Sequence, residues 1–121
     1  MTGYGDELGW SAAWLLRATN NSKYMTDFEK HWTEFKLGGL QTGQGKIRFF
    51  WDDKTPGLQI LIAKITGDEK YKKVAQTFTD FLLKEAPRTP KNLIFYAEIW
   101  GSLRHSSNAA LLLLQVRYLF F

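Results

Sequence analysis

A nine-residue pattern occurs twice in this chain, with the two copies 47 residues apart. Leu16-x-x-Thr19-x-x-x-Lys23-Tyr24 returns as Ala63-x-x-Thr66-x-x-x-Lys70-Tyr71. In each copy a short polar turn separates two stretches whose apolar residues recur at helical spacing, which predicts a helical hairpin. One hairpin cannot bury its own apolar side, so repeated hairpins are typical of a toroid or solenoid. The repeat therefore predicts an all-α fold built from stacked hairpins.

Apolar periodicity predicts helices over residues 5–18, 23–36 and 69–85, together with one from Thr55 to Gly67 and one from Ser102 to about Val116. Thr55 and Ser102 are predicted as N-caps because a hydroxyl accepts an orphan N–H of the first turn. Residues 37–50 hold four of the ten glycines, and residues 86–97 hold Pro87 and Pro90, so both segments are predicted as connections.

Composition excludes several classes of protein. The 121 residues suit one domain, and without cysteine there are no disulfides or thiolate metal sites. The net charge is +4, but the lysines are scattered and alternate with acids, which indicates a solvated surface and no nucleic-acid partner. The longest apolar run, residues 109–114, is far short of the roughly 20 residues that span a bilayer, so no membrane partner is expected.

Four motifs in order resemble those of glycoside hydrolase family 9 endoglucanases, which are secreted cellulases. They are Gly3-Tyr4-Gly5-Asp6-Glu7-Leu8, Trp51-Asp52-Asp53-Lys54, Thr66-Gly67-Asp68, and Trp100-Gly101-Ser102-Leu103-Arg104-His105 with Ser107-Asn108-Ala109-Ala110. The resemblance implies that residues 1–121 are an internal part of the catalytic domain. The family fold is an (α/α)6 barrel, and this chain would supply about two and a half of its six helical hairpins.

The resemblance also implies which chemistry is missing. Inverting glycosidases need a general acid and a general base, with carboxyl groups roughly 6.5–9.5 Å apart. The family's Asp-Ala-Gly-Asp motif and its catalytic glutamate do not occur in this sequence. Neighbouring pairs such as Asp6 with Glu7 and Asp52 with Asp53 do not readily flank a glycosidic bond. We therefore assign no catalytic residue and expect no cellulase activity from the isolated chain.

Substrate contact remains. Trp100 and Arg104 match the family's cleft tryptophan and arginine, which implies that the indole stacks on a glucosyl ring while the guanidinium binds its hydroxyls. The alternative is that Trp100 anchors the core and Arg104 is a surface charge. Trp51 is a further candidate for the cleft, although we favour a buried structural role for it. The expected ligand is cellulose or another β-1,4-glucan.

Asp6, Glu7 and Asp53 form a second constellation. Some family members hold a structural calcium ion with these acids and with backbone carbonyls, which would here come from Thr2 and Gly3. Ca²⁺ prefers six to eight hard oxygen ligands, so the residue types suit it. The alternative is that Asp6 and Glu7 serve the start of their own helix while Asp53 lies on the surface.

Further expectations concern the location and the completeness of the chain. Family members are exported, so we expect an extracellular location, and the lack of a signal segment before Met1 suggests that the chain is incomplete. The pattern also departs from the family at Glu98-Ile99 and from Gln115 to Phe121. A different class of function stays open, namely a non-catalytic helical-hairpin module that binds a protein partner.

Overall fold

The computed structural model describes residues 3–39, 48–92 and 99–120. In these ranges, five α-helices and one 3-10 turn follow one another: α1 (Gly5–Thr19), α2 (Ser22–Glu34), α3 (Thr55–Thr66), α4 (Glu69–Lys84), η2 (Pro90–Asn92) and α5 (Ser102–Phe120). Within these ranges the protein has no β-strand, only one isolated bridge between Phe50 and Asp53. The predicted all-α class is confirmed.

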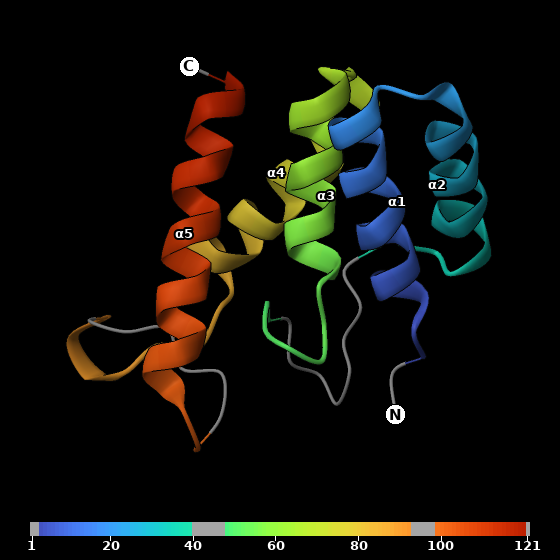
Figure 1. Cartoon of the computed structure of the whole chain (residues 1–121). Helices are drawn as coiled ribbons and strands as arrows, with labels where there is room; N and C mark the ends of the chain where they lie inside the picture. The colour runs from blue at the N-terminus through green and yellow to red at the C-terminus, as the bar shows by residue number, and fades with distance from the viewer. Residues whose placement is uncertain (1–2, 40–47, 93–98, 121) are drawn as a thin grey trace.

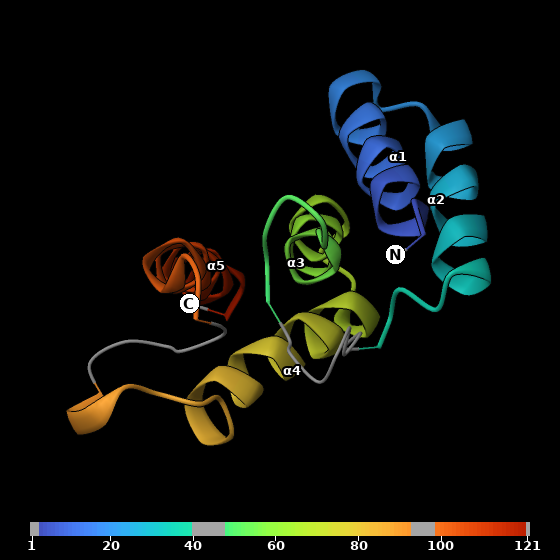
Figure 2. The ribbon, with the colours of Figure 1, turned by 90° about the horizontal axis from the view of Figure 1, so that it is seen from below.

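Helices α1, α3 and α5 form a row in which all three run in the same direction (Figure 1). Helices α2 and α4 run back, and both lie on the same side of that row when it is seen end-on (Figure 2). Each returning helix packs on the helix that precedes it, and α3 also contacts α1 and α5. This arrangement is two hairpins plus one further helix, consistent with part of a helical barrel.

The two copies of the repeat have the same turn geometry. Asn20 and Gly67 both adopt a left-handed backbone and donate their N–H groups to Leu16 and Ala63 respectively. One residue later, the side chains of Asn21 and Asp68 accept the N–H of the second residue of the next helix, at 3.0 and 2.8 Å. The internal repeat therefore encodes one turn used twice.

The core lies around α3. Eight of its twelve residues are buried, because α1, α4 and α5 all contact it. Between α2 and α4, Phe28 and Tyr71 are fully buried and stack edge-to-face at 5.8 Å. Gly9 allows α1 to approach closely, since a Cβ there would lie 2.8 Å from the side chains of Leu37 and Leu58.

Some predicted boundaries were wrong. Helix α5 continues to Phe120 instead of ending near Val116, and Ser102 is its first residue, not its cap. Thr55 is likewise inside α3, and its N–H is accepted by Asp53 Oδ1 at 2.9 Å. Parts of the two predicted connections, at residues 40–47 and 93–98, lie outside the described residues. None of the described helices has the length and apolarity to cross a membrane.

Candidate functional site

The three helices of the row begin at the same end of the molecule (Figure 1). We call this the helix-start end and define it as residues 4–7, 48–55 and 99–105. Three of the four sequence motifs contribute to it, although they are far apart in the chain. Because the three helices are parallel and lie in one layer, their first turns and the segments before them lie at the same end. The fold therefore brings the residues of the candidate site together.

Trp100 is 82% exposed, which rules out the interpretation that it anchors the core. It precedes Gly101, whose φ of 67° is a left-handed conformation that favours glycine. A Cβ at Gly101 would also lie 3.2 Å from the Arg104 guanidinium, so this side chain folds back over the turn. The Gly101 turn therefore has an exposed indole directly before it and the Arg104 guanidinium packed over it.

Trp51 is 71% exposed, so the buried role favoured for it is wrong. It lies in a tight turn closed by two backbone bonds between Phe50 and Asp53, at 3.1 and 3.3 Å. Lys54 Nζ donates to the carbonyl of Trp51 at 2.7 Å, and this bond stabilises the turn. The turn presents the second indole of the helix-start end to solvent.

Phe50 connects the two tryptophan segments, and the sequence patterns did not single it out. Its ring lies 5.9 Å from that of Trp51 and 5.4 Å from that of His105, which is buried at the start of α5. The guanidinium carbons of Arg48 and Arg104 lie 4.4 and 6.0 Å from the Phe50 ring centre. An aromatic residue next to Trp51 was the available signal, but its contacts with α5 depend on the fold.

Asn108 provides a second tie between these segments. Its side-chain amide donates to the carbonyl of Phe49 at 2.8 Å across a sequence separation of 59 residues. Asn108 belongs to the recognised Ser-Asn-Ala-Ala segment, but no role was predicted for it. Together with Phe50 it fixes the position of the Trp51 turn relative to α5.

Asp6 and Asp53 meet at the start of α3. Asp6 Oδ2 accepts the N–H of Lys54 at 2.8 Å, and Asp53 Oδ1 accepts that of Thr55. Asp53 is only 9% exposed, so the interpretation that placed it on the surface is wrong. Asp6 does not cap its own helix either, because it serves the first turn of α3.

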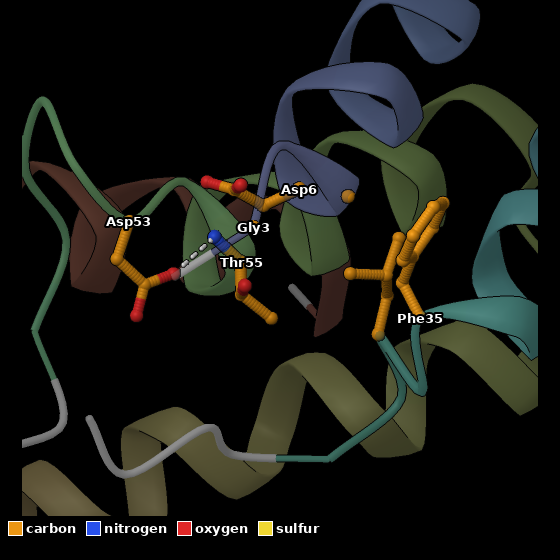
Figure 3. Close-up of a pocket in the computed structure, with 7 residues that line it drawn as sticks. Gly3, Asp6, Phe35, Asp53 and Thr55 are labelled. Atoms are coloured by element: carbon orange, nitrogen blue, oxygen red, sulfur yellow. Dashed lines mark hydrogen bonds between the residues drawn. The ribbon is translucent and has the colours of Figure 1, made fainter. Parts of the chain in front are cut away.

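The two aspartates line a small pocket of about 100 Å³. In Figure 3, Asp6, Asp53 and Thr55 lie on one side of it and Phe35 on the other; Gly3 is also part of the lining. Burial raises the pKa of the Asp53 carboxyl above 3.8, the bonds from Thr55 lower it in part, and the nearby charges of Asp6 and Asp52 raise it further. A cation in the pocket would relieve this cost.

The structure brings together three of the five predicted metal ligands: Asp6, Asp53 and Gly3. The Glu7 carboxylate is instead paired with Lys54 Nζ at 3.1 Å, and Thr2 lies outside the described residues. Among residues 3–39, 48–92 and 99–120, no three His, Asp or Glu side chains gather as a metal would require. The pocket therefore offers two carboxylates as possible metal ligands. A third carboxylate would be available only if Glu7 broke its ion pair with Lys54.

These features define a layer of parallel helices with an aromatic, hydrogen-bonding end. The sequence model of glycosyl hydrolase family 9 matches residues 1–119, and this chain belongs to that family. The match extends beyond the residues covered by the four motifs and includes Gln115 to Leu119.

Similar proteins are endoglucanases. Endoglucanase 2 and endoglucanase 5 of Arabidopsis thaliana are 32% and 37% identical, over 92% and 93% of this chain but only 23% and 20% of their own length. An endoglucanase from the termite Nasutitermes takasagoensis superposes with a TM-score of 0.85 at 39% identity, over 97% of this chain and 26% of its own.

The cellulase Cel9M of C. cellulolyticum, in a structure with cellobiose, gives a TM-score of 0.74 at 30% identity, over 94% of this chain and 26% of its own. The chain thus spans about a quarter of the length of its relatives.

Proposed function

We propose that this chain forms part of the substrate cleft of an endo-β-1,4-glucanase that hydrolyses cellulose with inversion. The observation that carries the proposal is the pair of exposed indoles, Trp51 and Trp100, at the end where α1, α3 and α5 begin. Indole faces stack on the apolar faces of glucosyl rings, and an arginine fork such as Arg104 donates to their hydroxyls. The presence of cellobiose in a Cel9M structure supports this choice of ligand.

In this proposal the chain's own residues bind and orient the glucan, while proton transfer belongs to residues that the sequence does not contain. Phe50 holds the Trp51 turn against the start of α5, and the Arg104 guanidinium packs over the Gly101 turn that follows Trp100. The cleft contribution is thus preorganised before sugar arrives.

Tryptophan fluorescence of the whole chain, titrated with cellotetraose, tests the cleft. We expect quenching by cellotetraose and none by the α-1,4-linked maltotetraose. Trp100→Ala should weaken binding by about tenfold, equivalent to 1.4 kcal/mol, which is within reach of a lost stacking contact.

Trp14→Ala is the matched control, because Trp14 is a half-exposed tryptophan in the middle of α1, away from the helix-start end. The affinity of this variant for cellotetraose should equal that of the wild type. Equal losses in both variants, or no sugar binding at all, would contradict the cleft assignment.

We also propose that the pocket at the start of α3 binds Ca²⁺. The carboxylates of Asp6 and Asp53 and the carbonyl of Gly3 would hold it. Glu7 would become a further ligand by breaking its ion pair with Lys54 and binding the ion instead. Two close, buried carboxylates with hard oxygen donors support this ligand set. The ion would have a structural role, tying α1 to the start of α3.

Thermal unfolding with and without Ca²⁺ tests the pocket. A ligand at 100 times its Kd stabilises the folded state by about 2.7 kcal/mol, so a raised Tm is expected. Asp53→Asn should abolish the gain, whereas Asp52→Asn, at the exposed neighbouring position, should keep it. A Tm that Ca²⁺ leaves unchanged in the wild type would rule the site out.

We further propose that the protein acts outside the cell in polysaccharide breakdown, as expected for the family. Secretion of the complete gene product into the medium checks this. The alternative class, a helical-hairpin interaction module, predicts a tight protein complex without affinity for sugar. The cellotetraose titration therefore separates the two.

A further inference from the structure

Asn20, Asn21 and Ser22 form the pattern Asn-x-Ser, with no proline at the middle position. This pattern is the acceptor signal for N-linked glycosylation, in which the first asparagine carries the glycan. The signal occurs once in the sequence, because Asn21, Asn92 and Asn108 are followed two residues later by lysine, isoleucine and alanine. Three residues alone do not make a site, so the place of the pattern in the fold decides whether it can serve as one.

The pattern lies in the turn between α1 and α2, at the end of the molecule opposite the helix-start end (Figure 1). Every residue from Arg17 to Lys23 is exposed. Helix α1 has 15 residues, and a rise of 1.5 Å per residue separates its two ends by about 22 Å. A bulky, hydrated glycan on this turn would therefore lie at the surface and away from the indoles of the proposed cleft.

The two side chains that the signal requires are not used to build the turn. The backbone N–H of Asn20 donates to the carbonyl of Leu16, and the side chain of Asn21 accepts the N–H of Lys23. These two bonds end α1 and cap α2. Within the part of the chain that the structure describes, neither the Asn20 amide group nor the Ser22 hydroxyl makes a hydrogen bond. The amide nitrogen of Asn20 is thus available for modification.

The second copy of the repeat shows that the same turn forms without the signal. Gly67 takes the left-handed position of Asn20, with φ of 67° against 53°, and Asp68 provides the cap of the following helix. Glu69 stands where the first copy has Ser22. The turn therefore needs a left-handed residue and a cap, but neither an amide at its first position nor a hydroxyl at its third. The acceptor signal is an addition that the fold does not require.

We propose that Asn20 carries an N-linked glycan. The proposal rests on the extracellular location proposed above, because the donor, a lipid-pyrophosphate-linked oligosaccharide, and its transferase belong to the secretory pathway. In the transfer, Nδ2 of Asn20 forms a bond to the anomeric carbon of the donor sugar and loses one proton. The bond from that carbon to the pyrophosphate oxygen breaks, and the lipid pyrophosphate leaves with the electron pair. The transferase selects Asn20 through the hydroxyl of Ser22.

Production of the whole chain behind a cleavable signal peptide in insect cells tests the acceptor directly, since secretion is then imposed whatever the natural location. We expect one glycan per chain. Peptide N-glycosidase F should remove it and leave a deamidated residue at position 20, which mass spectrometry of the tryptic peptide identifies. A secreted chain whose Asn20 is unmodified would overturn the proposal.

Matched variants separate the signal from the turn. Asn20→Gly keeps the left-handed turn, as Gly67 does in the second copy, and it should abolish the glycan. Ser22→Ala should abolish it as well, with an unchanged circular dichroism spectrum. Asn21→Ser is the control, because it keeps both a capping side chain and the signal, and it should remain glycosylated. A glycan that persists in Asn20→Gly, or one that is lost in Asn21→Ser, would contradict the assignment.

Peptide mapping of the complete gene product from its own host tests the natural state. We expect a secreted product that is glycosylated at Asn20. A product that stays inside the cell would overturn the extracellular location and the glycan together. A secreted product with an unmodified Asn20 would overturn the glycan alone, so the two failures are distinguishable.

Discussion

Two aromatic clusters in this molecule use the same residue types in opposite ways. At the helix-start end, Trp51 and Trp100 are exposed and contact solvent. Between α2 and α4, Phe28, Trp32 and Tyr71 stack on each other, with ring centres 5.1–5.8 Å apart. The first cluster leaves apolar rings available for a ligand, whereas the second uses them to hold a hairpin pair together.

The difference shows that an aromatic residue acquires its role from its place in the fold. The buried rings project from facing helices, where packing supplies many partner atoms. The exposed indoles lie in a turn and just before a glycine, where the backbone directs them away from the core. The buried cluster between α2 and α4 should therefore dominate stability, and the exposed indoles at the helix-start end should dominate binding.

The largest effect is expected from Phe28→Ala. Phe28 is fully buried and contacts both other rings of its cluster, so its removal should cost about 3–5 kcal/mol of unfolding free energy. Urea denaturation measures this loss. Trp100→Ala should stay within about 0.5 kcal/mol of the wild type, as is usual for surface changes. Comparable losses of unfolding free energy in the two variants would contradict the claim that the two clusters have different roles.

Asp53→Asn in metal-free buffer should have a smaller effect on the unfolding free energy, and it should increase stability where Phe28→Ala lowers it. Because burial raises the folded-state pKa of Asp53, its favourable contribution is complete below the unfolded value of 3.8 and is lost as pH rises through the folded-state pKa. The asparagine variant should therefore become more stable than the wild type across that rise, since it still accepts the Thr55 N–H.

Unfolding curves at several pH values with a chelator measure this difference. Asp52→Asn, at the exposed adjacent position, is the control and should show little change. A variant less stable than the wild type at neutral pH would show that the Asp53 charge is already balanced in the pocket without a cation.

The smallest effect is expected from Tyr71→Phe. The Tyr71 hydroxyl donates to Glu29 at 3.4 Å, a long bond whose loss should cost about 0.5–1.5 kcal/mol or less. Burial, with the charge of Glu29, raises the pKa of Tyr71 to about 12. The tyrosine's contribution is thus complete below pH 10.0 and is lost as pH rises towards 12.

Alkaline unfolding of both proteins checks this prediction. The wild type should lose stability relative to Tyr71→Phe between these pH values, while the ring stacking itself stays unchanged. Parallel pH profiles would show that the hydroxyl titrates as freely in the folded chain as in the unfolded one.

Sequence alone determined the family, the helical class and the local turns. The repeat fixed two equivalent turns, because helix ends depend on residues within one or two positions, such as Asn20 with Asn21 and Gly67 with Asp68. The family motifs likewise pointed to Trp100, Arg104, Asp6 and Asp53, whose roles in binding stay predictions.

Only the tertiary structure decided which of these residues are exposed and which meet. Asp6 bonds to Lys54 across 48 residues, and Phe50 contacts His105 on a helix much later in the chain. Such contacts depend on three parallel helices that begin at the same end of the molecule, which no local pattern specifies. Local hydrogen bonding is determined by neighbouring residues, whereas burial and long-range contacts arise only when separate segments pack together.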